Sequence, residues 1–152
     1  MPHHTKDPLA LEEQVCFAMV VAARSVLSVY RPLLEPMGLT HPQYLVLLAL
    51  WQEAPLSVKE LSTRLQLDPG TLSPLLKRLE AAGHLTRQRS AEDERQLAVT
   101  LTEQGRALRT EALLIPPAVV RRLGLGEAAL RDLHTSLTSV IAAAADENGS
   151  PA

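Results

Sequence analysis

The stretch that decides the fold is SVKELSTRLQLDPGTLSPLLKRLEAAG, residues 57–83. It opens with a capping box, because the Ser57 hydroxyl can accept the amide of Glu60 while the Glu60 side chain reaches back to the Ser57 amide. The helix that begins here is predicted to be short and to end near Leu65. Gln-Leu at 66–67 then forms a tight link.

A second helix follows that link. Asp68 has the side chain of an N-cap, and Pro69 suits the first helical position, where the missing N–H costs no hydrogen bond. The helix is expected to run to Ala82 and to stop at Gly83. Two short helices joined by about four residues predict a helix-turn-helix.

The residues after Gly83 predict a β-hairpin. Residues 84–89 and 95–101 alternate between apolar and polar side chains, and residues 90–94 form a polar loop between them. Thr102 is then expected to cap another helix. A hairpin that directly follows a helix-turn-helix is a wing.

The flanking segments read as helices. An apolar stripe runs from Leu9 to about Tyr30, Pro32 is expected to open a short second helix, and an apolar helix from 41 to 51 should be buried. Pro116-Pro117 is expected to break or bend the next helix, and the last one spans 127 to about 145. The predicted fold is mainly α with a small β-hairpin wing, that is, a winged helix-turn-helix with N- and C-terminal dimerisation helices.

One domain accounts for all 152 residues. Residues 9–40 and 104–145 are expected to form the dimerisation helices, and residues 41–103 the DNA-binding region. An isolated apolar stripe must be covered, so a twofold dimer is predicted.

Composition limits the alternatives. Leu, Ala and Val dominate the apolar residues, with only two Tyr, one Phe and one Trp, which disfavours an all-β fold. A single cysteine, Cys16, cannot form a disulfide within the chain or a cysteine cluster for a metal. No membrane-spanning run and no secretory signal is expected, so we expect a cytoplasmic protein.

Charge is unevenly distributed. The whole chain has a formal net charge of −2, but residues 56–110 hold nine Lys or Arg against seven Asp or Glu, which gives +2. Nucleic-acid binding depends on the local electrostatic field rather than on the net charge of the whole chain, so the charge of this region is compatible with DNA binding.

Several segments resemble one family. They are Tyr-Arg-Pro-Leu-Leu from Tyr30, Gly-Leu-Thr-His-Pro-Gln-Tyr-Leu-Val-Leu-Leu-Ala-Leu-Trp from Gly38, Leu-Asp-Pro-Gly-Thr-Leu-Ser-Pro-Leu-Leu-Lys-Arg-Leu-Glu from Leu67, and Glu-Asp-Glu-Arg at 92–95. These resemble the MarR family of winged-helix regulators. With Val-Cys-Phe at 15–17 they are similar to its organic-hydroperoxide-sensing branch, the OhrR repressors, over residues 11–115.

The helix from Asp68 is expected to enter the major groove of double-stranded DNA. Recognition or phosphate contact is assigned to Asp68, Thr71, Ser73, Lys77, Arg78, Arg87, Arg89, Asp93 and Arg95. The resemblance implies that Arg95 enters the minor groove and that a salt bridge from Asp93 orients it. The alternative is a solvated helix face and a loop kept soluble by its charges.

The resemblance also makes Cys16 the redox-sensing thiol. In the family two tyrosine hydroxyls of the partner subunit hold the thiolate. Tyr30 matches the first, whereas the second falls on His41 and a third family tyrosine falls on Val20. His41 is assigned as the second partner, because an imidazole can also donate a hydrogen bond. Otherwise Cys16 is a small apolar residue and His41 caps its helix.

The expected function is a peroxide-responsive repressor. An organic hydroperoxide oxidises Cys16 to the sulfenic acid, which a low-molecular-weight thiol then captures, and the dimer leaves a pseudo-palindromic operator. One alternative is a MarR-type sensor of a small apolar or phenolic ligand with Cys16 inert. A thiol peroxidase is less favoured, because this chain has no second cysteine to resolve an oxidised Cys16. A helical scaffold that binds no duplex is a further option. No enzyme activity, cofactor or metal is expected, and the adjacent His3 and His4 lack a third ligand.

Overall fold

The computed structural model describes residues 7–93 and 95–147, which divide into two compact units, one ending at Pro116 and the other beginning at Pro117. The first contains a 3-10 turn η1 (Leu11–Glu13), α1 (Val15–Leu34), a 3-10 turn η2 (Glu35–Met37) and α2 (His41–Gln52). Then come β1 (Leu56–Ser57), α3 (Val58–Leu65), α4 (Pro69–Ala81), β2 (Leu85–Arg89), β3 (Leu97–Leu101), α5 (Glu103–Ala107) and α6 (Arg109–Ala112). The last helices are α7 (Ile115–Leu123) and α8 (Glu127–Glu147).

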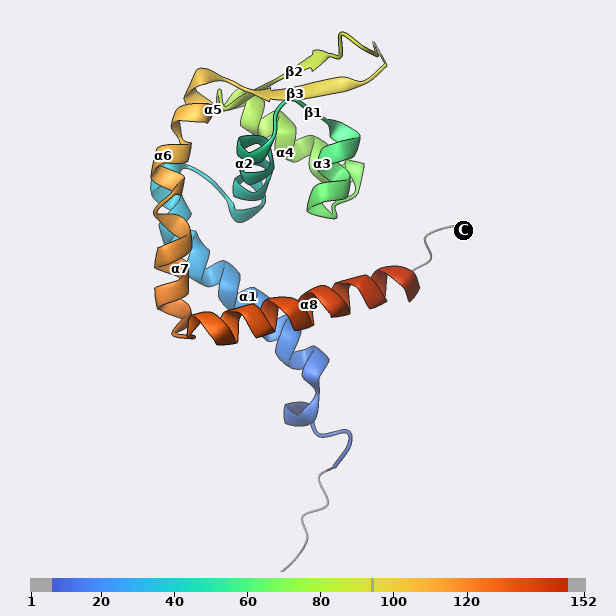
Figure 1. The fold of residues 1–152 in the computed structure, drawn as a ribbon, viewed down its shortest axis with the longest axis vertical. Coiled ribbons are helices and arrows are strands. Elements are labelled where there is room, and N and C mark those ends of the chain that lie inside the picture. The colour runs from blue at the N-terminus through green and yellow to red at the C-terminus, as the bar shows by residue number, and fades with distance from the viewer. Residues whose placement is uncertain (1–6, 94, 148–152) are drawn as a thin grey trace, which may run out of the picture. The chain divides into compact units, whose positions relative to one another are not determined.

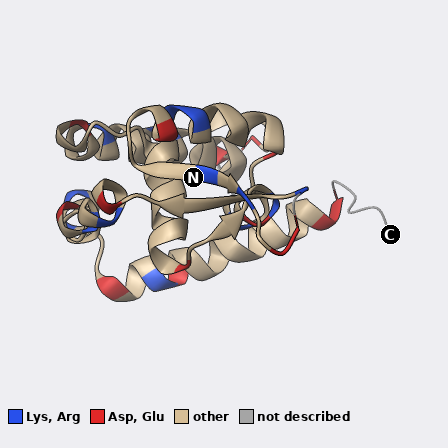
Figure 2. Cartoon of the chain, turned by 90° about the horizontal axis from the view of Figure 1, so that it is seen from above, with Lys and Arg blue, Asp and Glu red and all other residues tan. Residues whose placement is uncertain are grey.

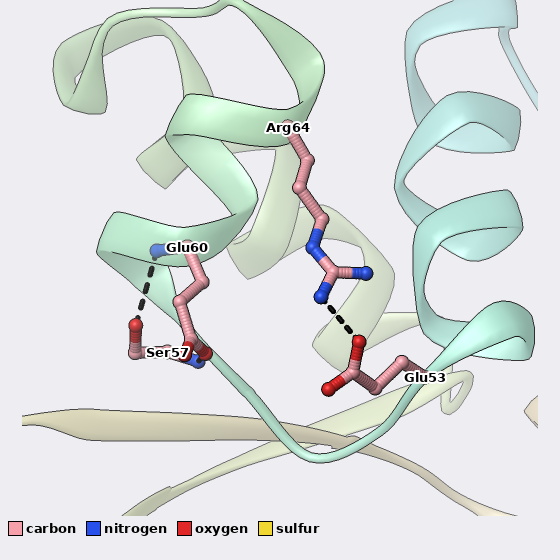
Figure 3. A network of polar contacts seen from close by, with 4 residues as sticks. All are labelled: Glu53, Ser57, Glu60 and Arg64. Carbon is pink, nitrogen blue, oxygen red and sulfur yellow. Dashed lines mark hydrogen bonds and ion pairs between the residues drawn. The ribbon is translucent and has the colours of Figure 1, made fainter.

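The helix-turn-helix is confirmed. The Ser57 hydroxyl accepts the Glu60 amide at 3.0 Å, and the Glu60 carboxylate accepts the Ser57 amide at 2.8 Å, so the predicted capping box begins α3 (Figure 3). Beside that cap, Arg64 of α3 forms an ion pair with Glu53, the residue just after α2, so the pair links these two elements. Asp68 caps α4 as predicted.

The wing is a three-stranded antiparallel sheet in the order β1-β3-β2. Leu85 pairs with Leu101 and Arg89 with Leu97 across the hairpin, whereas Leu56 of β1 pairs with Val99. The sequence did not predict β1, because two residues carry no periodic signal and the pairing joins segments more than forty residues apart. In Figure 1 the hairpin lies over α2, α3 and α4, and its tip projects beyond them.

The core of the first unit lies between these helices and the sheet. Eleven large side chains are less than 2% exposed, and most come from α2, α3, α4 and the sheet: Leu34, Val46, Leu47, Leu50, Leu56, Leu61, Leu72, Leu76, Leu79, Leu85 and Val99. The predicted burial of the helix from 41 is therefore confirmed. Each fully buried leucine contributes about 1.5–3 kcal/mol through removal of apolar surface from water.

The first helix differs from the prediction. It begins at Val15 rather than Leu9, and it continues through Pro32 to Leu34 instead of ending near Tyr30. Pro32 removes one backbone hydrogen bond, but only two helical residues follow it and Leu34 is buried, so packing outweighs the loss. No separate α-helix opens at Pro32, and the chain tightens into η2 before the left-handed Gly38.

The helices after the wing also differ. The helix capped by Thr102 is divided into α5 and α6, whereas the predicted break at Pro116-Pro117 is confirmed, because α6 ends at Ala112 and a new helix, α7, begins at Ile115 with both prolines in its first turn. Proline is tolerated there because first-turn amides have no partner within the helix. The predicted last helix is confirmed as α8.

Most of α1 is exposed. Leu34 is its only buried residue, and Val15, Phe17, Val20, Val21 and Leu27 are 38–70% exposed. By length and hydropathy alone the stretch Val15–Met37 could cross a membrane, although the sequence analysis expected no such segment. This is weak evidence, because Arg24 and Arg31 lie within it and a helix that pairs with a second chain has the same composition.

Candidate DNA interface and thiol site

One face of α4 is buried and the opposite face is exposed. Leu72, Leu75, Leu76 and Leu79, at helical spacing, face the core. Ser73, Lys77 and Arg78 lie on the exposed side, where both cations are free of ion pairs within the described chain. Such a face can present a hydroxyl and two positive charges to a duplex.

The N-terminus of α4 is capped by Asp68, which hydrogen-bonds to Thr71 in the first turn. The Asp68 carboxylate accepts the amide and the hydroxyl of Thr71, each at 2.9 Å. These hydrogen bonds, that from the hydroxyl first, hold the pKa of Asp68 below its usual value. Asp68 therefore positions Thr71, whose hydroxyl oxygen keeps its acceptor capacity for an outside donor.

The wing carries three of the predicted arginines in different settings. Arg89 and Arg95 are exposed, whereas the side chain of Arg87 is only 22% exposed and pairs with Glu80 at 3.2 Å. The Asp93 carboxylate accepts the backbone amide of Arg95 at 3.0 Å, and the described structure has no salt bridge from Asp93 to the Arg95 guanidinium. An Asx turn is the local alternative that a short carboxylate favours.

Charge is spread over the molecule. Figure 2 shows the Lys and Arg segments interleaved with Asp and Glu rather than gathered in one run. The described residues hold no group of three His, Cys, Asp or Glu side chains suited to a metal, and His3 and His4 lie outside the described residues.

Tyr30 and His41 lie against each other. Their ring centroids are 4.7 Å apart in an edge-to-face arrangement, and Tyr44, which the sequence analysis did not single out, lies 5.8 Å from Tyr30. The Tyr30 phenol and the His41 imidazole make no hydrogen bond to another described side chain or backbone group. The structure thus brings two of the three predicted redox residues together and leaves their polar atoms available.

Burial sets the protonation of this ring cluster, Tyr30, His41 and Tyr44. It raises the pKa of Tyr30 and lowers the pKa of His41. Burial, and then the neighbouring Tyr30, also raises the pKa of Tyr44. Tyr30 is therefore a neutral phenol and His41 favours the neutral imidazole near pH 7, in which one nitrogen donates and the other accepts.

Cys16 lies apart from the ring cluster of its own chain. It is exposed in the first turn of α1, and Tyr30 lies fourteen positions further along the same helix. At 1.5 Å per residue this is about 21 Å, so the thiol and the phenol cannot meet within one protomer.

The comparisons with known proteins identify the family. A family model described as transcriptional regulator SarA/Rot matches residues 28–111. The chain is 48% identical to the HTH-type transcriptional regulator TtmR of Methylorubrum extorquens over 88% of this chain and 69% of TtmR. It is 44% identical to the organic hydroperoxide resistance transcriptional regulator of Bacillus subtilis, covering 84% of each.

Solved structures agree. AbfR of Staphylococcus epidermidis, in its reduced form bound to DNA, shares 34% identity with a TM-score of 0.68, and the match covers 86% of this chain and 95% of that one. The overoxidized form bound to DNA matches with a TM-score of 0.67. The chain belongs to the MarR/SarA family of winged-helix transcriptional regulators and is a homologue of the organic hydroperoxide resistance regulator.

Proposed function

We propose that this regulator is a cytoplasmic, dimeric repressor that leaves its operator when an organic hydroperoxide oxidises Cys16. The observation that carries the proposal is a pair of donors, Tyr30 and His41, that hydrogen-bond to no other described residue, on a chain whose single cysteine is exposed on the same helix as Tyr30. Relatedness to a hydroperoxide resistance regulator supports it. TtmR is about as similar, and its name specifies no signal.

The DNA contacts are assigned to α4 and the wing, within residues 41–103. Thr71 and Ser73 face base edges or phosphates, and Lys77, Arg78 and Arg89 neutralise phosphates. Arg95 is exposed at the wing, where its guanidinium can enter a narrow minor groove. Two copies would place their recognition helices roughly 34–36 Å apart, so the operator would be a pseudo-palindrome.

Arg95→Ala is expected to weaken binding to every duplex and to reduce the slope of log K against log salt by about one unit, because one phosphate-region cation is lost. Fluorescence anisotropy over a series of KCl concentrations measures this slope. Arg131→Ala on α8 is the matched control and should leave it unchanged. A wild-type slope for Arg95→Ala would remove Arg95 from the contact set.

The dimer is assigned to the outer helices, residues 9–40 and 104–145. Leu133, Leu137, Val140 and Ile141 of α8 are 39–49% exposed, and α1 exposes the apolar side chains described above. Apolar stripes of this extent on two long helices are stabilised when a second copy covers them. The second copy also supplies what Cys16 lacks, because Tyr30 and His41 of the partner can reach a thiol that lies about 21 Å from those of its own chain.

The chemistry needs one thiolate and one peroxide. The sulfur attacks one peroxide oxygen, an S–O bond forms, the O–O bond breaks, and the alkoxide takes up a proton to become an alcohol. The sulfur loses two electrons and the peroxide gains them, which gives the sulfenic acid. A small thiol then displaces the hydroxyl, so that a mixed disulfide and water result. Either product ends the hydrogen bonds from phenol and imidazole to the thiolate and disturbs the packing of α1.

The proposal is tested with DNA binding of the purified protein. A duplex selected by the protein from a random library is titrated before and after treatment with cumene hydroperoxide, and mass spectrometry follows Cys16. Release that coincides with Cys16 oxidation, and that dithiothreitol reverses when glutathione is present, is expected. Binding that survives complete oxidation of Cys16 would disprove the mechanism.

His41→Phe is expected to slow oxidation of Cys16 about tenfold, because a hydrogen bond to a charged group is worth roughly 1.5–3 kcal/mol. Mass spectrometry under excess cumene hydroperoxide gives the rate. His41→Tyr is the matched control, since it restores a phenol donor and should retain the wild-type rate. If His41→Phe reacts as fast as wild type, His41 is not a partner of the thiol.

A second candidate function is a small-ligand sensor. A cavity of about 540 Å³ is lined by Leu27, Leu34, Leu39 and Pro42, and its wall also holds His41, the cation Arg31 and the carboxylate of Glu35. Its size and apolar walls suit a small apolar or phenolic ligand. This alternative predicts release by ligand with Cys16 unreacted.

A further inference from the structure

Glu80 joins the end of α4 to the start of the wing. Its Oε1 lies 3.2 Å from Nη2 of Arg87, and its Oε2 accepts the backbone amide of Arg87 at 3.0 Å. One carboxylate therefore holds both the main chain and the side chain of a residue in β2. The hydrogen bonds from Arg87 lower the pKa of Glu80, so the carboxylate stays ionised.

Arg87 is unlike the other wing arginines. It pairs with Val99 in the sheet register, and its Nε is buried without a hydrogen-bond partner among the described residues. Arg89 and Arg95 are exposed. A guanidinium that is held against the protein by a carboxylate offers less of its charge and fewer of its donors to a phosphate.

The contact spans a turn in the chain. Gly83 has a φ of 86°, and the chain reverses there from α4 into β2. Uncharged hydrogen bonds stabilise the same connection between α4 and the wing. The Thr102 hydroxyl donates to the Gly83 carbonyl at 2.6 Å, and the Thr102 amide donates to the His84 carbonyl at 3.1 Å. Glu80 and Arg87 add a charged link that closes the turn from the side of the helix.

We infer that Glu80 and Arg87 are positioning residues for DNA binding, which set the angle between the recognition helix and the wing. Arg87 thereby differs in role from the phosphate contact that its charge suggests. A helix in the major groove and a wing arginine in the minor groove must reach the duplex together, so a small change in their angle costs one set of contacts. The inference rests on the proposed DNA contacts of α4 and the wing.

Glu80→Asp is the sharpest test. It keeps the charge and leaves the field at the DNA unchanged, but its carboxylate is one methylene too short to hold both groups of Arg87. Binding to the selected duplex should weaken about fivefold, near the upper end for a partly exposed ion pair. Less than a twofold loss would overturn the inference.

The sign of the effect of Glu80→Gln is a second test. Removal of a negative charge beside DNA ordinarily strengthens binding. Glu92→Gln, in the exposed wing loop, is the control for this electrostatic effect, and it should bind the duplex as well as wild type or better. Positioning predicts the opposite for Glu80→Gln, which should bind several-fold more weakly. Tighter binding by Glu80→Gln would show that Glu80 is only a nearby charge.

The salt dependence separates positioning from contact. Arg87→Gln should weaken binding without changing the slope of log K against log salt, whereas loss of a phosphate contact lowers the magnitude of that slope by about 0.9. Binding is measured only for variants that circular dichroism shows to be folded. If Arg87→Gln does not fold, Glu80→Asp replaces it in the salt series. Failure of wild-type protein to select any duplex would refute the DNA-binding proposal itself, whereas wild-type affinity of Glu80→Asp would refute only the positioning role.

Discussion

Replacement of Gly105 by alanine is expected to destabilise the protein by at least about 3 kcal/mol, the upper range for overpacking in a core. A Cβ at this position would lie 2.0 Å from the His84 carbonyl oxygen, which belongs to the backbone and cannot move aside. Gly105 is also buried, and its carbonyl accepts the Trp51 indole N–H at 2.9 Å. The clash therefore opens the joint between α4, the wing and α5.

The measurement is urea unfolding followed by the fluorescence of Trp51, the single tryptophan of the chain. Gly126→Ala is the matched control, because a Cβ there meets nothing within 4 Å and the backbone is not left-handed. It should change stability by less than about 1 kcal/mol, as expected for a surface position at a helix start. A free energy of unfolding for Gly105→Ala within 1 kcal/mol of wild type, on the same order as the control, would contradict the packing described for this joint.

Cys16→Ser is expected to abolish release by peroxide, with a rate of release lower by on the order of a hundredfold or more, because a serine hydroxyl is not ionised near neutral pH and cannot attack an O–O bond. Cys16 is exposed and lies on α1. The variant should bind the selected duplex within about twofold of wild type before oxidant is added, because serine is nearly the size of cysteine and its hydroxyl can still hydrogen-bond to the proposed phenol and imidazole of the second copy.

The measurement is anisotropy of the labelled duplex after addition of cumene hydroperoxide. Met19→Leu removes another oxidisable sulfur from the same helix and is the matched control, since it should respond like wild type. Release of Cys16→Ser at the wild-type rate would exclude the thiol as the sensor. In that case ligands of the 540 Å³ cavity become the signal to examine.

Local chemistry allowed the helix-turn-helix to be predicted closely. The boundaries of α3 and α4 follow from Ser57, Glu60 and Asp68, whose caps act within three residues and need no distant partner. The alternation of the hairpin was also readable. By contrast, Pro32 was expected to begin a helix, and there tertiary packing decided otherwise, because α1 continues through Pro32 to the buried Leu34.

For the candidate site, too, the sequence selected residues, whereas their arrangement is known only from the structure. Residue type and resemblance selected Cys16, Tyr30 and His41, yet only the coordinates show that the two rings are in edge contact and that the sulfur of the same chain is remote from them. Tyr44 was missed because a tyrosine in an apolar helix reads as core. The ion pair of Arg87 was not predicted, because charge alone does not reveal a partner, and Glu80, seven residues earlier, becomes its neighbour only after the turn at Gly83.

The sequence by itself determined where the helices of the DNA-binding unit begin and which side chains they expose, because caps and apolar periodicity are interactions between near neighbours. Only the tertiary structure decided that β1 adds a third strand to the wing, that Arg87 is held by Glu80, and that the rings of Tyr30 and His41 are in edge contact. These depend on how the chain turns and on which segments it brings together, and pattern and propensity within a single helix or strand do not encode that.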